Sequence, residues 1–172
     1  MSAAYRYSVA ALALLAGTCL LAACAPSLNW REVQLGRLST LLPCKPDTAS
    51  RAVELGGQTL TMDMAGCEAG GALFAISRIQ AGNPAQAAAL MTSLREASLA
   101  HIAQAVVHPV ANSGDALTSF DVQVDGRRAD GTPLQARFKW LLADREVYQI
   151  AAYAERLRTE HTESLITEAR IR

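Results

Sequence analysis

Apolar and polar residues alternate along several stretches of the chain, and a period of two predicts β-strands. One alternation covers residues 59–63, and a second apolar stretch covers residues 72–80 after a glycine-rich segment. We expect these stretches to form a hairpin that turns around Ala69. The predicted partners are Met64 with Phe74 and Met62 with Ile76, which leaves Cys67 in the loop.

The longest alternation covers residues 120–152 and predicts a three-stranded antiparallel meander with turns at Ala129 and Asp144. The register that sets apolar residues opposite one another is preferred, because a slip of one residue would reverse the faces. The predicted pairs are Phe120–Phe138, Val122–Ala136, Val124–Leu134 and Asp121–Arg137 in the first hairpin, and Trp140–Tyr148, Phe138–Ile150 and Ala136–Ala152 in the second.

Two helices are expected between and after these strands. Asn83 followed by Pro84 is typical of a helix start, and apolar residues recur at spacings of three and four up to about Ala105. A shorter helix begins at Thr159 and points Leu165 and Ile166 inward. With one or two further strands in residues 30–42, the pattern predicts an α+β fold in which an antiparallel sheet is flanked by helices.

The N-terminus has the pattern of a secretory signal, with Arg6 before an uncharged apolar run over residues 8–21. The run is shorter than the roughly 20 residues that a membrane-spanning helix needs. Its end, Leu21-Ala22-Ala23-Cys24, resembles the bacterial lipobox, in which the cysteine receives lipid before cleavage. The resemblance implies a cleaved signal peptide (1–23), a lipidated tether (24–29) and a single periplasmic domain (30–172).

The alternative interpretation of this terminus is ordinary cleavage after Ala23 or Ala25, which would leave Cys24 as a free thiol. Lipidation at Cys24 would make the membrane the first partner, and the three acyl chains that a lipobox implies would anchor the protein stably. Ala25, where sorting to the inner membrane of enterobacteria uses aspartate, favours the outer membrane, with the domain facing the periplasm.

Length and charge narrow the possible functions. Removal of the signal leaves 149 residues, which is the size of one domain, with 15 basic and 16 acidic residues. This balance speaks against nucleic acid as a partner.

The mature chain keeps Cys24, Cys44 and Cys67. With Cys24 lipidated, an even pair remains in an oxidising compartment, so we predict a Cys44–Cys67 disulfide. A zinc site is the alternative, but neither cysteine has a second cysteine or a histidine at ligand spacing. A redox-active pair would show Cys-x-x-Cys, which the sequence lacks.

The order of these elements resembles the Mog1/PsbP-like fold, which occurs in small envelope proteins of unknown function. The resemblance is carried by the segments 41–46, 72–77, 147–150 and 169–171 and by the helix that begins at Pro84. It implies a binding or accessory role without naming a partner.

No arrangement of residues predicts catalysis, a metal site or a cofactor. His101, His108 and His161 have no second ligand at helical spacing, and Ser77, Ser98 and Ser113 lack the setting of a nucleophile. Asp121 and Asp125 share one face of a strand, where we expect them to be solvated or paired with a cation such as Arg137.

Two surface features remain. Arg127 and Arg128 should project from a hairpin tip, where they are candidate contacts for a partner, and Trp30 should pack on the core or lie at the membrane. The leading hypothesis is a non-catalytic binding module with an envelope protein as partner. The alternatives are a carrier of a small apolar or lipidic ligand, which needs a cavity between helix and sheet, and an envelope hydrolase.

Overall fold

The computed structural model describes residues 28–110 and 119–172, and strands take up 57% of them against 19% for helices. The strands are β1 (Arg31–Leu35), β2 (Leu38–Leu42), β3 (Asp47–Leu55), β4 (Gln58–Ala69), β5 (Ala72–Gln80), β6 (Ala103–Pro109), β7 (Ser119–Arg127), β8 (Pro133–Ala143), β9 (Glu146–Ala154) and β10 (Arg170–Ile171). The helices are α2 (Pro84–Ala100) and α3 (Thr159–Thr167).

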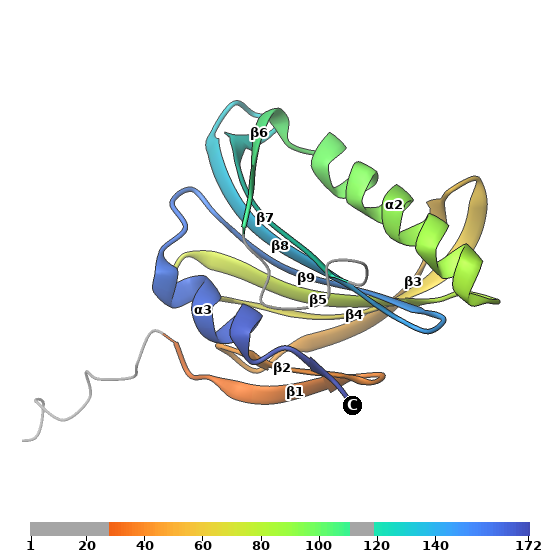
Figure 1. Cartoon of the computed structure of the whole chain (residues 1–172). Helices are drawn as coiled ribbons and strands as arrows, with labels where there is room; N and C mark the ends of the chain where they lie inside the picture. Colours follow the sequence, from red (N-terminus) through yellow and green to blue (C-terminus); the bar gives the residue numbers. More distant parts are fainter. Residues whose placement is uncertain (1–27, 111–118) are drawn as a thin grey trace, which may run out of the picture.

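The strands form two antiparallel sheets. The larger has seven strands in the order β3-β4-β5-β9-β8-β7-β6, and the smaller has three in the order β1-β2-β10. The large sheet curves around α2, which crosses its concave face, while the small sheet and α3 lie on its convex face (Figure 1). The large sheet is therefore the middle layer of three.

Each face of the large sheet has its own core. On the concave face, Leu90 and Leu94 of α2 pack towards Phe138 and Trp140 of β8. On the convex face, the core joins the small sheet and α3 to the large sheet, and its fully buried members include Leu38, Leu42, Phe74, Ile76, Ile150 and Leu165. Strand β9 contributes to both cores, so seven of its nine residues are buried.

The predicted α+β architecture, with helices flanking one antiparallel sheet, is wrong: the protein is mostly β, and a second sheet covers much of the convex face. Strands β3 and β6 lie at the two edges of the large sheet and were not predicted from the sequence. Every residue of β6 and seven of the nine in β3 are exposed. Such strands show no apolar alternation, because neither of their faces is continuously buried.

The predicted registers are also wrong, although the hairpins exist. Met62 pairs with Ile79, Phe120 with Trp140, and Phe138 with Ala151. The β4–β5 turn lies at Gly70 and Gly71, both at positive φ, so β4 continues through Gly66 and Cys67. Both faces of β9 are buried, so two registers of the β8–β9 hairpin pair apolar residues equally well. The two-residue turn after β8 determines the observed register, which is not the predicted one.

Several local predictions are confirmed. The Asn83 side chain caps α2 by accepting a 2.9 Å hydrogen bond from the Gln86 amide, and Pro84 is the first helical residue. The helix ends at Ala100 rather than near Ala105, with His101 as its C-cap, and the chain enters β6 at Ala103. Leu165 and Ile166 of α3 are buried as predicted.

Candidate binding groove on the concave face

Helix α2 leaves part of the concave face open. A cavity of about 360 Å³ lies between the C-terminal half of α2 and strands β3, β4, β8 and β9. Its lining is mostly apolar and includes Leu94, Ala97, Leu55, Met62, Leu134 and Tyr153. The predicted requirement for a carrier, a cavity between helix and sheet, is therefore met.

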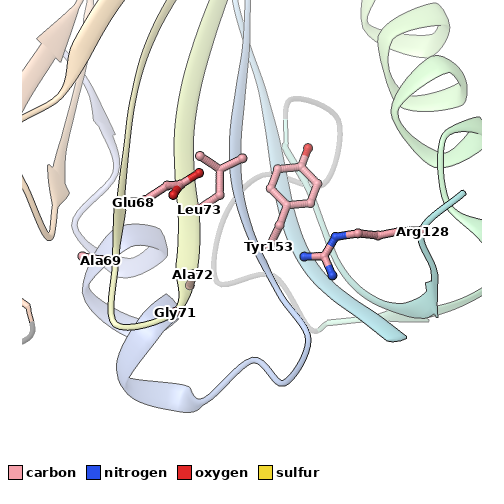
Figure 2. Close-up of a pocket in the computed structure, with 7 residues that line it drawn as sticks. All are labelled: Glu68, Ala69, Gly71, Ala72, Leu73, Arg128 and Tyr153. Atoms are coloured by element: carbon pink, nitrogen blue, oxygen red, sulfur yellow. The ribbon is translucent and has the colours of Figure 1, made fainter. Parts of the chain in front are cut away.

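A second cavity, of about 390 Å³, lies beside the β4–β5 turn. Its lining includes Leu73, which is 42% exposed, with Glu68 and Arg128 on either side of it. Figure 2 shows the Arg128 guanidinium directed towards the Tyr153 ring. Tyr153 belongs to the walls of both cavities, and we call the two together the concave groove.

Tyr153 is the central side chain of this groove. Its ring packs edge-on against Phe138, with 5.4 Å between the ring centroids. Burial raises the pKa of Tyr153 to about 12, so the hydroxyl stays protonated at neutral pH. Among residues 28–110 and 119–172 this hydroxyl has no hydrogen-bond partner.

Polar contacts fix the helix to the floor of the groove. The Ser98 hydroxyl of α2 lies 2.7 Å from Gln149 Oε1, and the Trp140 indole donates to the same oxygen at 2.9 Å. Trp140 is fully buried and stacks on Phe138. Gln149 therefore joins α2 to strand β8 in this part of the groove.

Arg127 and Arg128 lie at the β7–β8 hairpin, as predicted. Arg127 pairs with Pro133 at the end of the ladder, and its guanidinium donates to Gly131 O at 2.8 Å. Arg128 donates to Pro133 O at 3.2 Å and contributes to the groove, whereas Arg127 is exposed. Their role as contacts for a partner stays a prediction.

The other candidate residues do not form one site. His101 lines the groove at the end of α2, His108 on β6 lies 3.1 Å from Asp125, and His161 is buried in α3. Asp121 makes the predicted ion pair with Arg137, at 2.7 Å. In the described part of the chain, no cluster of histidine, cysteine and carboxylate groups could hold a metal ion.

Sequence reasoning missed the groove because of the register of β9. The predicted pairs put Tyr148 and Ile150 on the side of Trp140, whereas the structure places Gln149 and Tyr153 there. The overlooked signal is Asp144-Arg145, a two-residue turn in which Asp144 takes the left-handed conformation at φ 55°.

The predicted disulfide is present between Cys44, in the segment after β2, and Cys67 of β4. Disulfides persist in oxidising compartments, so this is a protein of the envelope or the extracellular space. Cys24 lies outside the described residues. Neither α2 nor α3 is long and apolar enough to cross a membrane, among the residues that the structure describes.

No protein-family model matches the chain, and no curated protein matches it. Among solved structures, the extracellular domain of PknH from Mycobacterium tuberculosis is similar to 71% of this chain and 79% of its own length. The TM-score is 0.40 and the sequence identity is 9%. At these values the likeness supports no conclusion about this protein.

Proposed function

We propose that the protein is anchored by lipid in the outer membrane, which Ala25 after the lipidated cysteine favours, and that its domain is a non-catalytic binding module. The concave groove is its ligand site. The lipobox at residues 21–24 supports the anchor, and the Cys44–Cys67 disulfide supports the compartment.

The observation that carries the binding role is the concave groove itself. Its two cavities have volumes of about 360 and 390 Å³, within the range of known ligand sites. Its walls are mainly apolar in one cavity, and Arg128, Glu68 and the Tyr153 hydroxyl add a small number of polar groups. Ligand sites typically combine these two features.

A carrier of a small apolar or lipidic ligand is the second candidate, and the position of the groove favours it. Leu28 packs against Gly70 in the β4–β5 turn, and the neighbouring Gly71 lines the groove. Cys24 precedes Leu28 by four residues, so the Cα atom of Cys24 lies within about 14 Å of that of Leu28 even with the chain extended.

The anchor is tested by detergent phase partitioning of the full-length protein made in bacteria. We expect wild type to enter the detergent phase and Cys24→Ser to stay in the aqueous phase, with the same far-UV circular dichroism. Equal partitioning of the two proteins would contradict lipidation at Cys24.

The groove is tested by placing a photo-crosslinking amino acid at Leu73 in living cells. Val106 on β6, which is 55% exposed and does not line the groove, is the matched control position. We expect a discrete adduct from position 73 and none from 106. A protein adduct supports the binding module and a lipid adduct the carrier, whereas equal labelling at both positions would rule out the groove as the site.

A further inference from the structure

Strand β3 is an open edge of the large sheet. Its nine residues pair with β4 without interruption from Asp47 to Leu55. Within the described ranges no strand pairs with its other side. An exposed strand of this length presents a row of free N–H and C=O groups that another strand can bind.

The turn after β3 determines which groups face outward. Gly56 and Gly57 form a two-residue turn at φ 60° and 75°, so Leu55 and Gln58 exchange both hydrogen bonds. Alternation along the antiparallel ladder then directs every second residue of β3 away from β4. The outward residues are Thr48, Ser50, Ala52 and Glu54.

The β4–β5 hairpin gives an independent check. Its own two-residue turn, at Gly70-Gly71, makes Ala69 and Ala72 a hydrogen-bonded pair. Odd-numbered residues of β4 therefore bond to β5, which leaves the even-numbered ones for β3. Gln58 is even-numbered, so both turns assign the hydrogen bonds of Gln58 to β3.

The opposite edge of the sheet is blocked. The β6–β7 pairing shifts between Ala103 and Val106, and Gln104 is left-handed at φ 55°. The Val110 amide bonds to Asp121 O, so Val107 and Pro109 face outward, and proline has no N–H to offer. Bulges and prolines are common protections of edge strands, and β3 has neither.

We propose that two copies of this protein pair antiparallel through β3, which joins their large sheets into one. This inference rests on the proposed lipid anchor for its choice of partner. An antiparallel pair of identical strands is related by a twofold axis normal to the sheet, so both copies show their convex faces on the same side. The first described residue, Leu28, packs in the convex core, and both anchors can enter one membrane.

Side-chain charge disfavours one register and is compatible with another. A pair centred on Arg51 would set two arginines directly opposite, which destabilises a sheet. A pair centred on Ala52 sets Ala52 against Ala52 of the second copy, Ser50 against Glu54, and Arg51 against Val53. No like charges then face one another, and anchoring in one membrane raises the effective concentration of the two strands.

The test is an intermolecular disulfide in the full-length protein in cells. Ala52→Cys should give a dimer on non-reducing gels, because the Cα atoms of a hydrogen-bonded pair lie about 5.5 Å apart, within disulfide range. Ala85→Cys, at an exposed position on α2, is the control and should stay monomeric. A monomeric Ala52→Cys, or equal dimer from both, would overturn the proposal.

A proline at an outward position of β3 tests the pairing between copies without removing a hydrogen bond of the β3–β4 ladder. Adding Ser50→Pro to Ala52→Cys should lower dimer formation about tenfold, because an outward hydrogen bond is lost while the β3–β4 ladder keeps its own. Unchanged dimer would contradict the pairing. Detergent partitioning of the same samples distinguishes the two proposals: a lipidated protein without the Ala52→Cys dimer refutes only the pairing, and a dimer without lipid refutes only the anchor.

Discussion

At the scale of single residues, the surroundings of His161 disfavour protonation of its ring. It is a buried residue in the first turn of α3, edge-on to Phe74, and its Nδ1 accepts a 3.3 Å hydrogen bond from the Arg158 amide. Burial, and after it the Arg158 guanidinium, lower the pKa of His161, while Glu160 acts in the opposite direction. The folded state therefore favours the neutral ring.

The lowered pKa predicts a pH-dependent stability. In the unfolded chain histidine titrates near pH 6.5, so the unfolded state binds the proton first as the pH falls. The stability that neutral His161 contributes is complete above about pH 6.5 and is lost as the pH falls towards the lower pKa of the folded state. Urea unfolding at pH values from about 7.5 to 5.5 should show a falling free energy of unfolding.

Substitution identifies the residue responsible. His161→Gln should lower the free energy of unfolding at pH 7.5 by about 1–3 kcal/mol, yet flatten its pH dependence. A slope that survives His161→Gln would assign the titration to another group.

Gly36, in the β1–β2 turn, combines positive φ with close approach. A Cβ there would lie 2.7 Å from Arg78 Cδ and 2.8 Å from the Tyr148 hydroxyl, which accepts from the Arg37 amide. Gly57 is also left-handed, at φ 75°, but has nothing within 4 Å. Comparing alanine substitutions at Gly36 and Gly57 therefore separates the cost of the positive φ from the cost of steric conflict.

We expect Gly57→Ala to cost about 1–2 kcal/mol, which is the backbone term alone. Gly36→Ala should cost about 1–3 kcal/mol more, because Arg78 and Tyr148 must move. Urea unfolding at one pH measures both variants. Equal losses would mean that the Arg78–Tyr148 contact adjusts freely.

At the scale of elements, sequence patterns located α2 and α3 because their signals are local. Asn83 and Pro84 start a helix through the geometry of a few neighbouring residues. The register of a strand depends instead on which residues are buried on each face. In β9, Tyr148 and Ile150 are buried in the convex core, and Val147 and Ala151 are buried in the concave core. The concave groove was not predicted because it depends on that register, which apolar pairing alone does not determine.

The disulfide joins elements of different sheets, since Cys44 follows β2 and Cys67 lies in β4. Closing a loop of this length stabilises a protein by about 3 kcal/mol on the chain-entropy model. The double variant Cys44→Ser/Cys67→Ser should lose that amount in urea unfolding. Reductant should bring wild type to the same midpoint and leave the double variant unchanged; any effect on the variant would implicate another group.

At the scale of the whole molecule, the two cores share strands. Strand β9 buries Val147 and Ala151 in the concave core and Tyr148 and Ile150 in the convex core, and it hydrogen-bonds to both β5 and β8. Loss of either covering layer would therefore expose one face of strands whose other face forms the second core. We expect the three layers to unfold together.

The two tryptophans report the two cores separately. Trp30 packs edge-on against Phe74 in the convex core, and Trp140 stacks on Phe138 in the concave core. Trp30→Phe and Trp140→Phe each leave one fluorescent reporter. In each variant, the urea transition followed by tryptophan fluorescence should coincide with the one followed by far-UV circular dichroism, as two-state unfolding requires. If Trp140 changed before the circular dichroism signal, α2 would detach from the sheet in a separate step, and the concave groove would open without loss of the convex core.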